Sequence, residues 1–207
     1  MSVDRNVERA VLWYWIGSFA IGMPLLFDWI FAWNVAATVS RPALVLLLLA
    51  TFAATQGLYV IVAHHGDRPI HWPATIIFAL GNGFFETLAF ASVYRIGEII
   101  GHAVVALVAP NAASVAGFLL GMFFFTIYGG LIHGLFWLRK LPPHLNDSPR
   151  SKAIRRIRPI FEVALVFGWS LVFWLNRDFW TVTAIHIMVD VGLMLQVRPP
   201  LFISSKF

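Results

Sequence analysis

Long apolar stretches separated by short polar segments account for most of this chain. Each stretch is long enough, at about 17 to 25 residues, to cross the hydrocarbon core of a bilayer as an α-helix. The pattern therefore predicts an all-α fold, a polytopic transmembrane helix bundle with about six spans, forming a single integral membrane domain over residues 1–207. The predicted spans are residues 11–33, 42–63, 72–94, 113–138, 159–175 and 179–197.

Proline, glycine and charge refine these boundaries. Pro24 lies inside the first stretch and predicts a kink. The apolar residues 95–109 predict either an extension of the third helix or an interfacial segment. Residues 138–158 combine prolines with many charges, which predicts a loop. Two pairs of glycines spaced four apart in the fourth span predict close helix–helix contact: Gly117 with Gly121, and Gly130 with Gly134.

The composition excludes a soluble domain. The chain is 59% hydrophobic and 12% charged, with a mean hydropathy of +0.79, and a soluble core could not hide that much apolar surface. Cysteine is absent, which excludes disulfides, thiolate nucleophiles and cysteine metal sites. The net charge is +5, but seven of the fifteen Lys and Arg residues lie in residues 139–158 beside two spans. Basic residues clustered beside membrane spans indicate the orientation of the chain and form a surface for anionic lipid. Membrane lipid is therefore an expected partner, and nucleic acid is not.

The distribution of basic residues also predicts an orientation. With the N-terminus inside, six spans place twelve Lys and Arg residues on the inner side and only Arg41, Arg95 and Arg177 on the outer side. Because cytoplasmic segments carry the excess of positive charge, both termini are predicted to be cytoplasmic. Five tryptophans near the span ends match an aromatic belt at the membrane interfaces: Trp13, Trp15, Trp72, Trp137 and Trp180.

Four ionisable residues lie well inside the predicted spans, and these are the candidates for chemistry. His186 and Asp190 are one helical turn apart on one face of the last span. Helix rise places Glu86 at about the height of His186, and His133 at about the height of Asp190. An ionisable group at membrane depth rarely faces lipid, which predicts that the four converge. The alternative is that each one hydrogen-bonds a neighbouring helix and serves packing.

Other charged residues lie closer to the predicted span ends. There, water or lipid headgroups can solvate them, so no chemical role is expected. They are Asp28, Glu98, His102 and Glu162.

The four candidates resemble the motifs of the CAAX-protease and bacteriocin-processing (CPBP) family of intramembrane proteases. The resemblance covers residues 72–197 and rests on FFETLAF around Glu86, GGLIHGLFW around His133, and TAIHIMVD, which contains His186 and Asp190. It implies a metal-independent glutamic endopeptidase in which Glu86 and His133 activate a water while His186 and Asp190 stabilise the oxyanion. The chain departs from the family where Thr87, Ala91 and Gly129 replace a Glu, an Arg and a Phe of those motifs.

Because of these departures, a degenerate, non-catalytic relative is an alternative to an active protease. The protease needs no cofactor. A competing class is an accessory subunit of a larger membrane protein complex, with other membrane protein subunits as partners. A further alternative is a subunit that binds haem or a chlorophyll-type pigment through its histidines as axial ligands, since neutral imidazole commonly ligates a tetrapyrrole metal.

Overall fold

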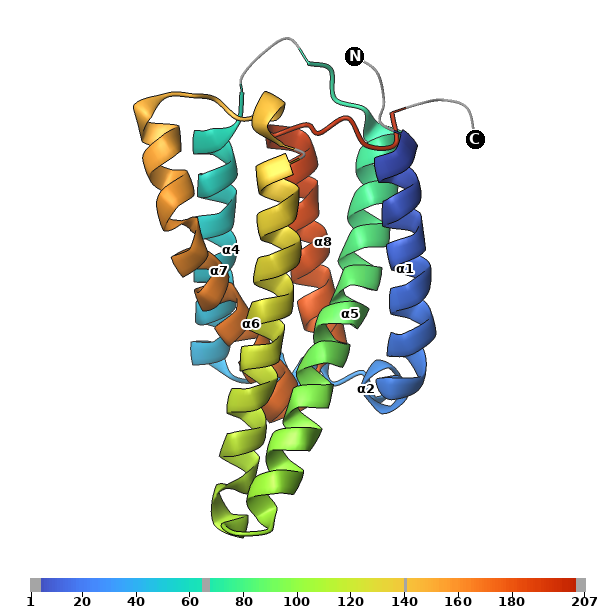
Figure 1. Cartoon of the computed structure of the whole chain (residues 1–207), viewed down its shortest axis with the longest axis vertical. Coiled ribbons are helices and arrows are strands. Elements are labelled where there is room, and N and C mark those ends of the chain that lie inside the picture. The colour runs from blue at the N-terminus through green and yellow to red at the C-terminus, as the bar shows by residue number, and fades with distance from the viewer. Residues whose placement is uncertain (1–4, 65–67, 140, 204–207) are drawn as a thin grey trace.

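A bundle of α-helices forms the described part of the chain, residues 5–64, 68–139 and 141–203, in this computed structural model (Figure 1). The predicted all-α helix bundle is confirmed, and no β-strand occurs among these residues. The α-helices are α1 (Arg5–Leu25), α2 (Phe27–Ala32), α3 (Val35–Val39), α4 (Pro42–Val62), α5 (Trp72–Ala106), α6 (Ala113–Arg139), α7 (Pro149–Asn176) and α8 (Phe179–Gln196). Two short 3-10 helices complete the description, η1 (Pro110–Ala112) and η2 (Pro142–His144).

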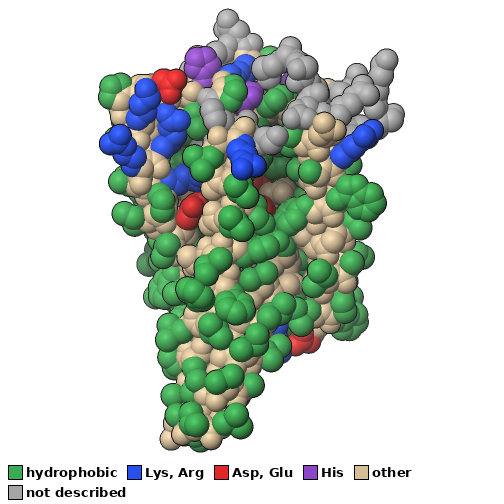
Figure 2. Space-filling model, in the orientation of Figure 1, with side chains coloured by type: hydrophobic (Ala, Val, Ile, Leu, Met, Phe, Trp, Pro, Cys, Tyr) green, Lys and Arg blue, Asp and Glu red, His purple; other side chains and the backbone are tan. Residues whose placement is uncertain are grey.

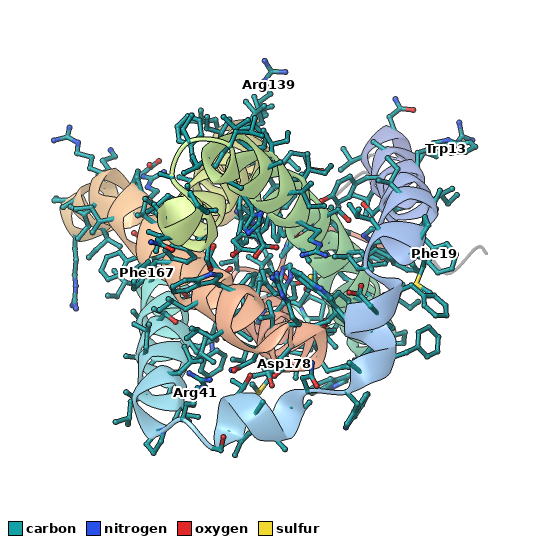
Figure 3. The ribbon with its side chains drawn as sticks, turned by 90° about the horizontal axis from the view of Figure 1, so that it is seen from below. Trp13, Phe19, Arg41, Arg139, Phe167 and Asp178 are labelled. Atoms are coloured by element: carbon teal, nitrogen blue, oxygen red, sulfur yellow. The ribbon has the colours of Figure 1, made fainter. Side chains whose placement is uncertain are left out.

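Five helices, α4 to α8, are long and apolar enough to cross a membrane, so the chain is a membrane protein. Helix α1 has 21 residues and packs along α5, but it carries Glu8 and Arg9 near its start and is less apolar. Trp13 and Phe19 point outward from α1 (Figure 3) and are 71% and 46% exposed, as lipid-facing side chains would be. The first and last described residues lie at the same end of the bundle (Figure 1).

The first predicted span is wrong in its boundaries. Instead of one kinked helix over residues 11–33, α1 begins at Arg5 and ends at Leu25, and the chain continues as α2. Pro24 lies in the last turn of α1, where its missing N–H and its ring disfavour continuation of a regular helix.

The fifth span also begins earlier than predicted, at Pro149 instead of residue 159, so the predicted loop of residues 138–158 is helical over its second half. The Ser148 hydroxyl accepts a hydrogen bond from the Ser151 amide at 3.2 Å, and Pro149 occupies the first helical position. Both features favour the start of a helix at this point. The segment 95–109 is an extension of the third helix as far as Ala106.

Helices α5 and α6 form the most closely packed pair, and their far ends project beyond the other helices as a hairpin (Figure 1). A Cβ on Gly121 would lie 2.8 Å from the Tyr94 carbonyl oxygen, and one on Gly97 would lie 2.7 Å from the Leu120 carbonyl oxygen. Only glycine allows the two backbones to approach this closely. The prediction of close contact is therefore confirmed for Gly117 and Gly121. It is wrong for Gly130 and Gly134, where a Cβ would have no neighbour within 4 Å.

Polar contacts tie the short helices to the far end of the bundle, opposite the termini. The Thr38 hydroxyl of α3 donates to Asp178 at 2.6 Å, and Asn176 donates to Thr38 at 3.1 Å. Glu98 of α5 forms ion pairs with Arg95 and with Arg177 at the α7–α8 turn. Lys and Arg side chains gather mostly at the opposite end, where the termini lie (Figure 2).

Candidate functional site

The candidate site lies where α5 and α8 approach each other in the middle of the bundle. A Cβ added to Gly83 of α5 would lie 2.8 Å from the Ile187 backbone nitrogen of α8. The absence of a side chain at Gly83 lets the two backbones come into contact. As a result, Glu86 and Asn82 on α5 face His186 and Asp190 on α8.

Three of the four predicted residues are in direct contact. His186 Nε2 lies 3.3 Å from Glu86 Oε2 and 3.6 Å from Asp190 Oδ2. The three residues are only 2–4% exposed, so all three are removed from lipid and water. Buried ionisable groups need partners of this kind, because an isolated buried charge is costly.

Asn82 forms hydrogen bonds with both acids, Glu86 and Asp190. Its Nδ2 donates to Glu86 Oε2 at 2.6 Å and to Asp190 Oδ2 at 3.1 Å. The orientation of this amide is set by Trp15 of α1, whose indole N–H donates to Asn82 Oδ1 at 3.3 Å. Trp15 is 6% exposed, so its assignment to an interfacial aromatic belt is wrong.

Thr87 determines which ring nitrogens of His186 carry protons. Its hydroxyl donates its single proton to the Gly83 carbonyl at 2.5 Å, so it accepts from His186 Nδ1 at 3.0 Å. With Nδ1 protonated, Nε2 of a neutral ring would turn a lone pair toward two carboxylates. The close approach at Nε2 therefore requires a further proton, held on Nε2 or on one of the two carboxyl groups.

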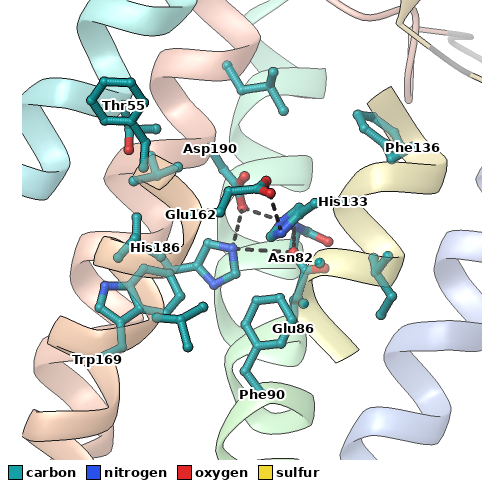
Figure 4. Close-up of a pocket in the computed structure, with 18 of the residues that line it drawn as sticks. Thr55, Asn82, Glu86, Phe90, His133, Phe136, Glu162, Trp169, His186 and Asp190 are labelled. Carbon is teal, nitrogen blue, oxygen red and sulfur yellow. Dashed lines mark hydrogen bonds and ion pairs between the residues drawn. The ribbon is translucent and has the colours of Figure 1, made fainter. Parts of the chain in front are cut away.

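A cavity of about 280 Å³ lies against this cluster, and His133 of α6 forms part of its wall (Figure 4). The Phe90 ring packs near both imidazoles, with its centroid 5.7 Å from each of His133 and His186. The structure thus places all four predicted residues at one cavity, where His186 contacts both Glu86 and Asp190. Glu86 pairs with His186, whereas the family resemblance implied a pair with His133.

Sequence reasoning missed Glu162 and Arg158 of α7, which also line the cavity. Glu162 Oε1 lies 3.8 Å from His133 Nδ1 and forms an ion pair with Arg158. Glu162 was expected to have no chemical role, but its side chain, 26% exposed, lies at the wall of the cavity. The i,i+4 spacing of Arg158 and Glu162 was the available signal.

Neither a metal site nor an open axial ligand is apparent at His186. Among the described residues, no group of three or more His, Asp and Glu side chains is arranged to hold a metal ion. Both ring nitrogens of His186 are engaged, by Thr87 and by the acids. His133, with a side chain 32% exposed, is the histidine of the cavity that is open to a ligand.

Comparison with known proteins identifies no relative. No family model, curated protein or solved structure matches this chain.

Proposed function

We propose that this protein is an intramembrane glutamic hydrolase of the CPBP type, an endopeptidase that cleaves a membrane-resident polypeptide. One observation carries this proposal: Glu86, His186 and Asp190 form a proton-sharing cluster at the wall of a cavity that also contains His133. Acidic and basic side chains that contact one another at a cavity are typical of a site for general-base catalysis.

In the proposed mechanism, a water in the cavity is deprotonated by Glu86 as it attacks the scissile carbonyl. Asn82 holds the Glu86 carboxylate by its Oε2 atom, which fixes its direction toward the cavity. A proton on His186 Nε2 then stabilises the oxyanion that forms, since a fixed donor at a low-dielectric site acts strongly. Asp190 keeps His186 in position. His133, held near Glu162, takes up the proton that Glu86 removed from the water and delivers it to the leaving amine, which returns Glu86 to its carboxylate form.

The test is the change Glu86→Gln, which retains the shape and the bond to Asn82 but removes the base. Cleavage of quenched fluorescent transmembrane peptides by the reconstituted protein should fall by about 10² to 10⁴, the range for loss of a general base. Asp28→Asn is the matched control, because Asp28 is an exposed acid of α2 away from the cavity. Equal rates for the Glu86 variant and the unmodified protein, or no cleavage by the latter, would overturn the proposal.

A second candidate, an accessory subunit of a larger membrane complex, is supported by the projecting α5–α6 hairpin. Leu107 and Val108 at its tip are 85% and 84% exposed. Exposed apolar surface of this kind marks protein or membrane contacts. In that case the protein should migrate as a larger complex on native gels, and Leu107→Asp should release it without a change in its own thermal stability.

For the orientation, we propose that both termini are cytoplasmic. The Lys and Arg side chains gathered at the end that holds the termini support this assignment (Figure 2).

A further inference from the structure

The cavity is incompletely closed because the two halves of α6 pack differently. Near η1, Gly117 and Gly121 bring α6 into backbone contact with α5. In the other half, a Cβ on Gly130 or Gly134 would meet no atom within 4 Å. Gly130 is exposed and lines the cavity, so at this point the wall consists of backbone alone.

The other side of this opening is α1. Val11 and Tyr14 of α1 line the same cavity as Gly130 of α6. However, α1 packs on α5 and α2, while α6 packs on α5 and α7. Figure 2 shows the result: the surface is hollowed beside α6, toward α5 and α1, and acidic side chains are visible inside.

The surface around this opening is lipid-facing. Leu12 and Ile16 on α1 are 38% and 55% exposed, and Leu131 and Leu135 on α6 are 59% and 43% exposed. No Asp, Glu, Lys or Arg occurs between residues 99 and 138. Side chains of this type face hydrocarbon in a membrane protein, so the opening leads into the bilayer.

On the α7 side, two charged residues, Arg158 and Glu162, line the cavity close to His133, among apolar side chains of the same helix. The cavity is therefore lined mostly by apolar side chains, and its charged groups come from α7 and, as Glu86 and His186, from α5 and α8. A molecule that fits this polarity has an apolar chain joined to a polar group.

We infer that an apolar chain enters the cavity sideways from the bilayer, between α1 and α6 past Gly130, and that its polar part lies toward Arg158 and Glu162. The inference deepens the proposed function, because the entering chain is the substrate of that site. It restricts the substrates of this site to molecules that reside in the membrane and excludes water-soluble peptides.

The test uses photoactivatable chains in phosphatidylcholine vesicles that contain the full-length protein. One arm uses phosphatidylcholine with a diazirine on its acyl chain, and the other uses a poly-leucine transmembrane peptide with photo-leucine. Mass spectrometry then locates the adducts. Val189 and Leu193 line the cavity and are 7% and 5% exposed, so adducts on them require entry. Leu46 of α4, 66% exposed, reports labelling of the outer surface.

Adducts on Val189 or Leu193 are expected in the peptide arm, whereas adducts on them in the phospholipid arm alone would show a lipid site and overturn the inference. Gly130→Leu should abolish them and keep those on Leu46. Gly134→Leu is the matched control and should change neither, since Gly134 does not line the cavity. Adducts confined to Leu46 in both arms, or equal adducts in both glycine variants, would overturn the inference. Glu86→Gln should keep the interior adducts, so failed hydrolysis with intact entry would count against the proposed function alone.

Discussion

Thr87 controls how the His186 ring is presented to the acids, although it does not touch the cavity reactants. Thr87→Val removes the acceptor of the Nδ1 proton and leaves a buried donor unpaired, which costs about 1–3 kcal/mol. We also expect hydrolysis to fall about tenfold in this variant, which corresponds to about 1.4 kcal/mol on the activation barrier, because the His186 ring loses the partner that fixes its orientation. Thr87→Ser keeps the hydroxyl and should restore most of the rate. Nitrogen NMR of the His186 ring should show a tautomer change only in the valine variant, and the same spectrum in both would contradict the assignment.

His144 predicts a pH dependence of stability at the end of the bundle that holds the termini. Burial, reinforced by the neighbouring Arg68 charge, lowers the pKa of His144 from 6.5 to about 4. The unfolded chain, with its ordinary pKa, therefore takes up this proton first as the pH falls. The stability from neutral His144 is complete above about pH 6.5 and is lost as the pH falls toward 4.

The measurement is the thermal unfolding midpoint in detergent between pH 7.5 and 4.5. His144→Asn should flatten the decline below pH 6.5 relative to the unmodified protein. His71→Asn, at an exposed position, should leave the decline in place. An unchanged decline in His144→Asn would assign the effect to other groups.

The sequence was sufficient to find Glu86, His186 and Asp190 but not the side chains that hold them in place. His186 and Asp190 share a face by their spacing, and matched depth linked them to Glu86. The hydrogen bonds of Asn82 to the acids and to Trp15 depend on helix rotation, which the sequence leaves undetermined. Glu162 was not assigned to the site because it lies only three residues inside the predicted fifth span, yet the structure places it at the cavity.

At the scale of helices, close packing of α5 against α6 depends on glycines at specific positions. Gly121→Leu would force side-chain atoms against the Tyr94 carbonyl and ring, both within 3.0 Å of the first added atom. Overpacking of this kind costs about 1–3 kcal/mol, and more where backbone must move. We expect a lower unfolding midpoint for this variant.

Gly134→Ala, on the same helix, serves as the comparison. It has open space around the added methyl and gains helix propensity, up to about 1 kcal/mol. Its unfolding midpoint should be unchanged or higher. A loss of stability equal to that of Gly121→Leu would show that the open half of α6 is packed in the membrane.

Helix boundaries were the least predictable feature, since proline has opposite effects at two positions. Pro24 lies where α1 ends, whereas Pro159 lies inside α7. Pro24 lies in an apolar stretch and Pro159 follows a basic run, so proline by itself did not mark where a helix ends. Ser148 before Pro149 was the informative pattern, because a capping hydroxyl followed by proline favours a helix start.

At the scale of the whole molecule, α5 is longer than the hydrocarbon core of a bilayer is thick. Its 35 residues rise about 52 Å, whereas the hydrocarbon core is about 30 Å thick. Helix α4, with 21 residues, rises about 32 Å and matches that thickness. Arg41 and Arg177 mark the far end of the shorter helices, so the α5–α6 hairpin extends past this polar level (Figure 1).

We therefore expect the tip of the hairpin to lie outside the membrane, on the side opposite the termini. The chain has no cysteine, so Leu107→Cys introduces a single thiol at a position where the native side chain is 85% exposed. A membrane-impermeant maleimide added to intact cells should label it, because a thiol in water ionises and one in hydrocarbon does not. Leu131→Cys, at a site 59% exposed on the lipid-facing part of α6, should stay unlabelled. Labelling of Leu107→Cys only after cell lysis would reverse the proposed orientation, and no labelling in either case would place the tip in lipid or against a partner.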